Sequence, residues 1–324
     1  MADKIRVAML GVGIHGLSHI KAVAALPELV ELVAAADVHK EHLEGAAMDF
    51  GVAHRFTDAR KAAEEADADA VIICLPNHLH APVTLTALRA GKHVLVEKPM
   101  ALTYQDAEEM VETAERCGKL LMSGQSLRFS SPHRKIKALL REGAVGEVRH
   151  VVHRRMSKGM GRPEDSWFGL QAQSGGILPG IGSHSIDAML WWLEEDASRV
   201  YAEIRSLNPN IDIEDEVSIT ARTRSGVVLT MAFSFNFAGG QEWIICGDEG
   251  VLMLRGQELT LNGQPQDIPE MVELEGEGKL HQEFFTAIRD ERALIEASGR
   301  HVLPSIAVIC AAQESAMTGE VVTL

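Results

Sequence analysis

The sequence predicts an α/β protein with two domains, in which a doubly wound parallel sheet is followed by an α+β half. Residues 1–124 alternate short apolar runs with amphipathic segments, whereas the chain beyond residue 141 forms longer alternating runs joined by turn residues. The 324 residues are 46% hydrophobic and 24% charged, an ordinary globular composition. This length suits one large or two medium domains.

The first half carries the pattern of a sheet that is buried on both faces. We expect strands at residues 7–10, 30–36, 70–75, 93–96 and 120–122, and helices at residues 15–26, 40–50, 58–66, 81–90 and 105–117. Strands that are apolar throughout and alternate with helices belong to a parallel sheet covered by helices on both sides. Residues 1–124 are therefore expected to form one doubly wound domain.

The second half carries the pattern of a half-exposed antiparallel sheet. We expect strands at residues 147–156, 199–206, 215–222, 227–235, 243–245 and 251–254, and helices at residues 132–141, 185–193, 281–297 and 304–317. Ser225-Gly226 and the G-D-E-G run at residues 247–250 join neighbouring strands as hairpin turns. Residues 125–324 are expected to form one α+β domain.

Charge and cysteine content exclude several classes of protein. The 31 Lys and Arg residues against 46 Asp and Glu residues give a formal net charge of −15, which would repel nucleic acid and anionic membranes. The four cysteines are scattered without metal-ligand or disulfide spacing, so we expect no metal site. No apolar stretch approaches the roughly 20 residues that span a bilayer. We expect a cytoplasmic protein whose partner is a small molecule.

A glycine motif, G-V-G-I-H-G, follows the first predicted strand and begins the first predicted helix, which is the context that supports dinucleotide binding. Gly11 would permit the tight turn, Gly13 would let backbone amides reach a pyrophosphate, and Gly16 would let the helix pack closely. Ile14 and His15 lie in the first helical turn, where free N–H groups favour an anion. The alternative is a glycine-rich turn without ligand.

Asp37 ends the second predicted strand, 21 residues after Gly16. A carboxylate there can accept hydrogen bonds from the ribose hydroxyls of the adenosine and would repel a 2′-phosphate, so NAD is expected rather than NADP. His39 and Lys40 would soften that preference. Asp37 could also cap the helix that begins near Lys40, a role compatible with ribose binding.

Several further motifs occur along nearly the whole chain. They are P-N-H-L-H at residues 76–80, A-G-K-H-V-L-V-E-K-P at 90–99, G-Q-S-L-R-F at 124–129, the segment from Gly175-Gly176 to His184, and G-D-E-G at 247–250. In these motifs the sequence resembles the glucose-fructose oxidoreductase / inositol dehydrogenase (Gfo/Idh/MocA) family. The resemblance implies an NAD(P)-dependent oxidoreductase with a Rossmann domain at 1–124. It also implies a domain at 125–324, with a large, mostly antiparallel open sheet, that binds substrate and pairs chains into homodimers or homotetramers.

The resemblance also implies which residues surround the cofactor. Glu97 and Lys98 would line the nicotinamide end, and the Lys98–Pro99 peptide bond would be cis. The other cofactor contacts that it implies are Leu75, Asn77 and His80.

Lys98 is the first candidate for a catalytic residue. It follows a parallel strand at the carboxyl edge of the sheet, where open α/β folds bind ligands. A partly desolvated lysine near a positive nicotinamide would have a lowered pKa, which suits proton exchange with a substrate hydroxyl. The alternative is a surface lysine paired with Glu97.

His184 matches the position of the family's catalytic histidine. The family pattern before it usually holds an aspartate that is assigned a part in the catalytic triad, where this chain has Gly180. Three interpretations follow: Lys98 and His184 suffice, another acid replaces the aspartate, or the chemistry is altered or lost. A core histidine is the alternative role for His184.

Five residues are candidates for substrate contacts. Asp187 would share a helical face with His184, although a structural role is at least as plausible. His153 and Arg155 belong to an acid-free basic stretch at residues 149–162 that would favour an anionic substrate, or that simply balances acids elsewhere. Trp167 could stack on a sugar or cover the core. Arg128 could contact cofactor or substrate, or form an ion pair at a hinge.

The leading hypothesis is an NAD-dependent dehydrogenase that moves hydride between nicotinamide and a secondary alcohol of a sugar, cyclitol or polyol acid. Lys98 would exchange the hydroxyl proton with help from His184. Two other classes stay open. One is an NAD-binding regulator or scaffold with a decayed site, and the other is a lyase or glycosidase that uses NAD as a recycled cofactor.

Overall fold

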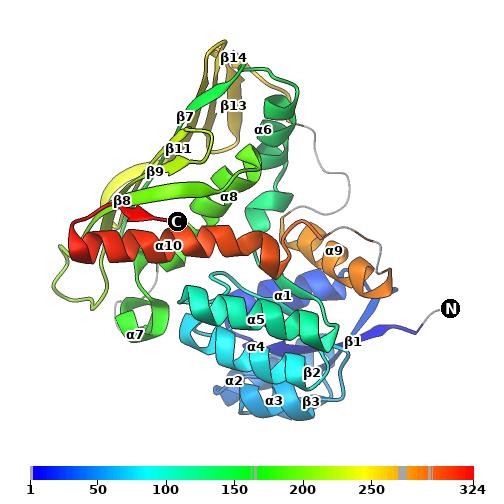
Figure 1. Cartoon of the computed structure of the whole chain (residues 1–324). Coiled ribbons are helices and arrows are strands. Elements are labelled where there is room, and N and C mark those ends of the chain that lie inside the picture. Colours follow the sequence, from blue (N-terminus) through cyan, green and yellow to red (C-terminus); the bar gives the residue numbers. More distant parts are fainter. Residues whose placement is uncertain (1–2, 162, 164–165, 269–275, 291–292, 294) are drawn as a thin grey trace. The chain divides into compact units, whose positions relative to one another are not determined.

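The computed structural model describes residues 3–161, 163, 166–268, 276–290, 293 and 295–324 (Figure 1). The chain divides into two compact units. The first comprises Met1–Phe129 and Glu273–Leu303, and the second comprises Ser130–Val272 and Pro304–Leu324. The expected boundary at residue 124 therefore lies close to the first change of unit, but the second half of the chain contributes to both units.

The first unit contains a parallel six-stranded sheet in the order β3-β2-β1-β4-β5-β6. This confirms the predicted doubly wound sheet. The strands are β1 (Ile5–Leu10), β2 (Val30–Ala36), β3 (His54–Phe56), β4 (Ala70–Ile73), β5 (His93–Val96) and β6 (Leu121–Ser123). β3 was not expected, because its three residues are largely exposed and do not form an apolar run.

Five helices follow the strands of this sheet in sequence: α1 (Ile14–Ala24), α2 (Lys40–Phe50), α3 (Ala59–Glu65), α4 (His80–Arg89) and α5 (Tyr104–Cys117). Their ends follow local chemistry. Asp58 caps α3 by accepting the backbone N–H groups of Arg60 and Lys61, and Thr103 caps α5 by accepting the N–H of Asp106. Gly118 ends α5 in the left-handed conformation.

A sixth helix, α9 (Glu277–Arg289), comes from the C-terminal part of the chain and belongs to the first unit. The helix predicted at residues 281–297 begins four residues earlier and ends at Arg289. Its predicted assignment to the second domain is wrong, because these residues belong to the first unit. The physical reason is its apolar face. Leu280, Phe284 and Phe285 are buried in the same core as residues of β1 and α1.

The second unit contains a nine-stranded sheet in the order β14-β13-β12-β11-β7-β10-β9-β8-β15. Both predicted hairpins are confirmed, since β9 pairs antiparallel with β10 and β11 with β12. β10 and β7 are parallel. The strands are β7 (Val148–Lys158), β8 (Ala197–Arg205), β9 (Glu216–Thr223), β10 (Val228–Ser234), β11 (Asn236–Gly247), β12 (Val251–Arg255), β13 (Glu258–Leu261), β14 (Gln264–Pro265) and β15 (Val322–Thr323).

Helices α6 (Ser131–Arg141) and α8 (Ser183–Leu193) contact each other and pack against β11 of this sheet. Their aromatic side chains meet those of the strands. Trp192 of α8 lies 5.0 Å from the ring of Trp243 in β11, and His133 of α6 stacks on Trp192 at 5.2 Å. α7 (Gln171–Ser174) and a π-helical turn (Leu178–Gly182) precede α8.

The last helix, α10 (Gly299–Thr318), begins in the first unit and continues in the second. Pro304 therefore lies inside it, and the predicted start of a helix at residue 304 is wrong by about one turn. In the part of the chain that the structure describes, no helix is both long and apolar enough to cross a membrane.

Candidate functional site

The glycine turn between β1 and α1 is shaped by contacts that leave no room for side chains. Gly11 has φ +95°, and a Cβ there would lie 2.1 Å from the carbonyl oxygen of Cys74. A Cβ on Gly16 would lie 2.1 Å from the carbonyl oxygen of Gly11, so α1 packs directly on the turn. Gly13 has no atom within 4 Å of its Cβ position, so space is open before the helix N-terminus. This is the geometry that a pyrophosphate requires.

Asp37 connects the end of β2 to the glycine turn. Its Oδ2 accepts the backbone N–H of Val12 at 2.9 Å, and its Oδ1 accepts the N–H of His39 at 2.9 Å. The ring of His42 lies 3.3 Å from Oδ1. The residue before α2 is His39, so Asp37 holds the loop ahead of the helix and does not cap it. Its carboxylate is thus fixed at the carboxyl edge of the sheet, where the ribose is expected.

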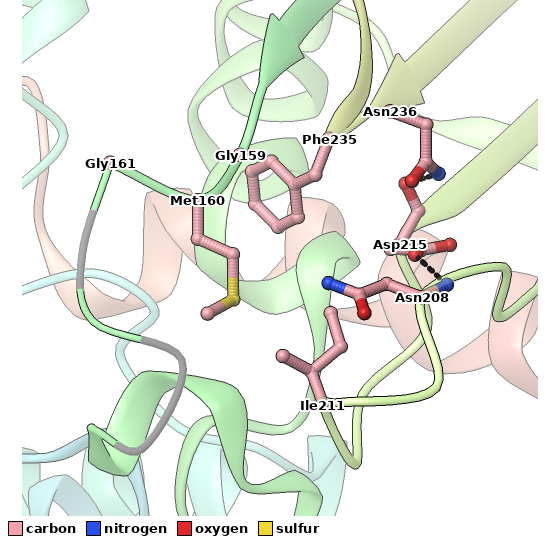
Figure 2. A pocket seen from close by; sticks show the side chains of 8 residues that line it. All are labelled: Gly159, Met160, Gly161, Asn208, Ile211, Asp215, Phe235 and Asn236. Carbon is pink, nitrogen blue, oxygen red and sulfur yellow. Dashed lines mark hydrogen bonds between the residues drawn. The ribbon is translucent and has the colours of Figure 1, made fainter.

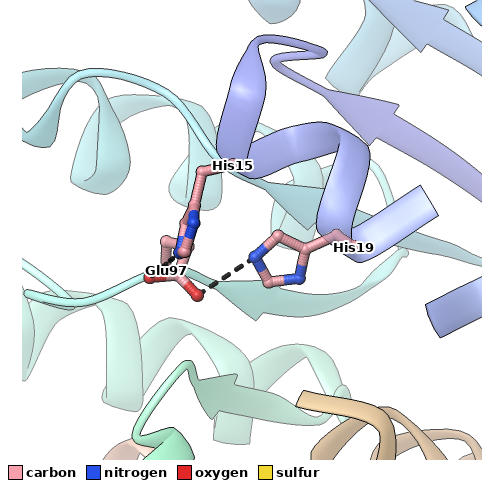
Figure 3. Close-up of side chains that lie close together, drawn as sticks. All are labelled: His15, His19 and Glu97. Carbon is pink, nitrogen blue, oxygen red and sulfur yellow. Dashed lines mark ion pairs between the residues drawn. The ribbon is translucent and has the colours of Figure 1, made fainter. Parts of the chain in front are cut away.

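Glu97, directly after β5, lies beside two histidines of α1 (Figure 3). His19 Nε2 is 3.1 Å from Glu97 Oε1, and His15 Nε2 is 3.9 Å from Glu97 Oε2. Glu97 is 7% exposed and His19 is 1% exposed. Burial alone would disfavour both charges, but their mutual attraction and a contact of His19 with Cys74 prevail. The pKa of His19 is therefore raised and that of Glu97 lowered, so both are charged at neutral pH.

Lys98 follows Glu97 at the same edge, and its backbone N–H donates to Glu97 Oε2 at 3.1 Å. The Lys98–Pro99 peptide bond is cis, as the resemblance implies. His80 links the Lys98–Pro99 segment to the residues that follow β4. Its Nδ1 lies 2.7 Å from the Pro99 carbonyl oxygen, and its Nε2 lies 2.9 Å from the carbonyl oxygen of Leu75. Burial lowers the pKa of His80.

Three of the predicted cofactor residues follow β4 in the chain and are partly or fully buried. His80 is fully buried and Asn77 is 4% exposed, while the Leu75 side chain lies 3.3 Å from the Cβ position of Gly11. By contrast Ile14, in the first turn of α1, is 94% exposed. The Leu75 side chain lies beside the glycine turn, and the contacts of all four residues with a cofactor stay predictions.

His184 lies in a continuous helical run of the second unit. The N–H of Gly180 donates to the carbonyl of Gly176 at 3.1 Å, and the run continues through the π-helical turn into α8. Gly180 and His184 are four residues apart across the π-helical turn, and Gly176, with φ +98°, directly precedes the run. The place where a side chain would start at residue 180 is filled by the ring of Phe168, 2.8 Å away.

A carboxyl group that the sequence analysis did not single out lies against Gly176, directly before this run. The Glu214 oxygens are 2.1 and 2.2 Å from the Cβ position of Gly176. Burial raises the pKa of Glu214 to about 7. Glu214 and residue 176 are 38 positions apart in the chain, so sequence spacing alone could not have connected them. The structure thus places a titratable acid against Gly176, four residues before the glycine that replaces the family aspartate.

Two arginines of the basic stretch on β7 pair with acids. Arg149 pairs with Glu147 and Asp248, and Arg154 pairs with Glu242. Arg162 lies outside the described residues. These pairs favour the interpretation that the stretch balances acids elsewhere.

Strand alternation places His153 and Arg155 on the covered face of the sheet. His153 is 1% exposed and stacks on Trp243 with 3.5 Å between ring centroids. Burial lowers the pKa of His153 to about 3 and also lowers the pKa of Arg155. This position of His153 is typical of a core residue.

The three other substrate candidates lie in different surroundings. Arg128 is 4% exposed and donates to the backbone carbonyls of Glu296 and His301 in its own unit. Asp187 is buried within α8. Trp167 is half-buried, with its ring 5.6 Å from that of Phe168. Their roles toward a substrate stay predictions, although the placement of Arg128 favours a structural role.

The second unit also contains a cavity of about 350 Å³ (Figure 2). Apolar side chains line it beside amide groups, and the lining residues are Gly159, Met160, Gly161, Asn208, Ile211, Asp215, Phe235 and Asn236. Both oxygens of buried Asp215 accept backbone N–H groups, those of Leu207 and Asn208, at 2.8 Å each. Amide groups beside an aromatic ring can hold a molecule with hydroxyl groups and apolar C–H faces.

Comparisons with known proteins agree with this geometry. Residues 5–125 match the profile described as an oxidoreductase family with an NAD-binding Rossmann fold, and residues 133–253 match the GFO/IDH/MocA C-terminal domain. The chain is 30% identical over 312 residues to 1,5-anhydro-D-fructose reductase of Ensifer adhaerens, covering 90% of each chain. It is 28% identical over 299 residues to 4-carboxy-2-hydroxymuconate-6-semialdehyde dehydrogenase of a Sphingobium species, covering 89% of this chain and 91% of that protein.

A solved structure resembles the chain along its whole length. It is the WlbA dehydrogenase from Bordetella pertussis in complex with NADH and UDP-GlcNAcA, with a TM-score of 0.88 and 25% identity. The similarity covers 99% of each chain.

Proposed function

Because the chain belongs to the GFO/IDH/MocA family of NAD-binding oxidoreductases, we propose that it transfers hydride between NAD and a secondary alcohol of a sugar, cyclitol or polyol acid. The observation that carries this proposal is the group formed by the glycine turn, Asp37 and the Glu97–Lys98 segment. These lie at the carboxyl ends of β1, β2 and β5 in one parallel sheet.

The residues present in the first unit fit a dinucleotide. The open space at Gly13 lets backbone N–H groups of the α1 N-terminus approach a pyrophosphate. The fixed carboxylate of Asp37 suits ribose hydroxyls and disfavours a 2′-phosphate, which supports NAD over NADP. NAD, when bound, supplies a hydride acceptor in its oxidised form and a donor in its reduced form.

Lys98 is proposed to hold or release the proton of the reacting hydroxyl group. In the oxidation direction Nζ takes this proton as the C–H bond gives up its hydride, and in the reduction direction Nζ returns a proton to the carbonyl oxygen. Glu97 supports Lys98 by accepting its backbone N–H. His184 is proposed to assist the proton exchange.

The sugar-like class of substrate is supported by one relative and one solved structure. The reductase named above acts on an anhydrosugar by its name, and the WlbA structure holds a sugar nucleotide by its title. The cavity in the second unit offers Asn208, Asn236 and the ring of Phe235. These groups suit a polyol.

The test is the spectrophotometric turnover of NAD and NADH with a panel of sugars, cyclitols, polyols and sugar acids. Lys98→Met is expected to lower kcat by about 10²- to 10⁴-fold, the usual contribution of a positioned proton-transfer group. Lys61→Met is the matched control, since this exposed lysine pairs only with Glu65 on α3 in the described contacts.

Two results would contradict the proposal in different ways. NAD binding without turnover of any panel member would favour the regulator or scaffold. Turnover of a glycoside or eliminated product without net NADH, with cofactor retained through purification, would favour the lyase or glycosidase.

A further inference from the structure

Two histidines of α1 and one glutamate after β5 form a compact group of donor atoms in the first unit (Figure 3). One nitrogen of His15, one nitrogen of His19 and one carboxylate oxygen of Glu97 all lie within 4.8 Å of one another. Figure 3 shows both rings directed from the helix toward the same carboxylate. This is the separation at which three side chains can share one cation.

The spacing of the two histidines is that of a metal-binding helix. Residues i and i+4 lie one above the other on a helix, so His15 and His19 present their rings to the same side. Two imidazoles and a glutamate are a ligand set that zinc takes in enzymes, and such three-ligand sites leave a fourth position for water. The prediction of no metal site rested on the four scattered cysteines.

The buried ring nitrogen of the group, His19 Nε2, has a close ionic contact but no well-aligned hydrogen bond among the described residues. Glu97 Oε1 lies 3.1 Å from it. The contact is a close ion pair. A cation between the ring and the carboxylate would replace this ion pair with two metal–ligand bonds. The His15 side chain is 46% exposed, so a cation can enter from solvent.

Other groups of the chain contact His19 and Glu97 and orient them, as the hydrogen-bond partners of metal ligands usually do. His19 Nδ1 lies 3.1 Å from Nε2 of His281, a buried residue of α9. Glu97 Oε2 accepts the backbone N–H of Lys98. These partners fix the ring and the carboxylate in the orientation that points them at His15.

We propose that His15, His19 and Glu97 form a site for a divalent cation of the zinc class, and that this cation and the dinucleotide exclude each other. Binding releases the proton of His19, so that the ring offers its lone pair. The exclusion rests on the proposed function, because His15 lies in the first turn of α1, where the pyrophosphate is expected. The positive charge of Lys98 acts on Glu97 and opposes a second cation there.

The experiment measures Zn²⁺ binding to the full chain after removal of metals and cofactor, by titration calorimetry. Co²⁺ absorption in the visible range reports the number of ligands. We expect one cation per chain, and we expect His15→Ala to weaken binding by at least about tenfold. Lys98→Met is expected to strengthen binding, because the opposing charge is removed.

His42→Ala is the matched control. It removes a half-exposed histidine that also pairs with a carboxylate, that of Asp37, but that has no third donor in the described structure. Its zinc affinity should equal that of the wild type. His15 is on the surface, so His15→Ala should fold normally, and thermal melts check this.

The outcomes separate the site from the proposed function. No zinc binding, or binding that His15→Ala leaves unchanged, overturns the site. Zinc and NAD that bind together without weakening each other overturn the exclusion. Weaker zinc binding in the presence of NAD supports both. Because the readout is metal affinity, a chain without dehydrogenase activity still tests the site.

Discussion

The carboxyl group of Glu214 fills the space in front of Gly176. Its oxygens lie 2.1 and 2.2 Å from the position that a Cβ at residue 176 would take. Gly176 has φ +98°, so both the backbone and the neighbouring carboxyl require glycine here. An acid with a pKa raised to about 7 by burial thus packs against Gly176, directly before the helical run that leads to His184.

Glu214→Gln is expected to change how stability depends on pH. The pKa of Glu214 is raised from 4.5 to about 7 in the folded chain, so its stabilising contribution is full below pH 4.5 and is lost as the pH rises through 7. The change is on the order of 2 kcal/mol for a side chain that is partly exposed. Urea unfolding at pH 5 and pH 8 should therefore show a smaller loss of stability in the variant than in the wild type.

The exposed Glu258 supplies the control for that measurement, because Glu258→Gln should keep the wild-type dependence on pH. The Glu214→Gln variant also tests whether Glu214 replaces the acid absent at Gly180. If it does, a step near pH 7 in the kcat/KM profile of the wild type disappears in Glu214→Gln. A profile that keeps this step would leave Glu214 with a structural role only.

Gly16→Ala and Gly13→Ala are expected to separate folding from cofactor binding. A Cβ at residue 16 would lie 2.1 Å from the Gly11 carbonyl, so Gly16→Ala should lose roughly 1–3 kcal/mol of stability together with NAD affinity. A Cβ at residue 13 meets nothing within 4 Å, so Gly13→Ala should lose NAD affinity alone. Thermal melts and NAD titrations measure the two effects.

Gly45 provides the control for this pair, since it lies inside α2 and its Cβ position is also open. Gly45→Ala should leave NAD affinity unchanged and raise stability by about 0.5–1 kcal/mol. Equal effects of Gly13→Ala and Gly45→Ala on NAD binding would argue against a phosphate at the glycine turn.

Asp37→Ser is expected to reduce the preference for NAD over NADP. The carboxylate is fixed by the N–H groups of Val12 and His39, so its charge stays where a 2′-phosphate would come. We expect the ratio of kcat/KM values for the two cofactors to fall by at least about tenfold, which corresponds to about 1.4 kcal/mol. An unchanged ratio would show that another residue selects the cofactor.

Acid is expected to destabilise the second unit through its buried histidines. Burial lowers the pKa of His153 to about 3 and that of His133 to about 4, from an ordinary value of 6.5. Both rings are therefore neutral in the fold. Their contribution to stability is full above pH 6.5 and is lost as the pH falls toward 4 and then 3, each on the order of 3 kcal/mol.

His153→Phe should therefore reduce the loss of stability between pH 6.5 and pH 4, since phenylalanine keeps a ring against Trp243 and does not titrate. The exposed His54 supplies the control, because His54→Phe should leave the dependence on pH unchanged. Denaturant unfolding at several pH values measures both. Equal slopes in wild type and His153→Phe would contradict the assignment.

Local periodicity was enough to predict the two kinds of sheet. Parallel strands buried on both faces differ from half-exposed antiparallel strands in their residue pattern, and the hairpins at Ser225-Gly226 and residues 247–250 have their own turn chemistry. The pattern could not predict the parallel pairing of β7 with β10. When a long connection joins two strands, the tertiary packing of the domain decides whether they pair.

The place of α9 was also beyond local reasoning. Its apolar face is evident in the sequence, but Phe284 and Phe285 could bury against either unit. Likewise the sequence could not show that two arginines of the basic stretch on β7 have acidic partners. Arg149 meets Asp248 and Arg154 meets Glu242 across the sheet, and about 90 to 100 chain positions separate the partners.

The sequence by itself determined the glycine turn, Asp37 and the Lys98 segment, because the chemistry of each depends on a short stretch placed after a strand. Only the tertiary structure decided which side chains complete these features. His19 meets Glu97, and Glu214 meets Gly176, because the sheet and the helical run bring distant segments within a few ångströms. Contacts between such segments depend on how the elements pack, and no spacing along the chain encodes them.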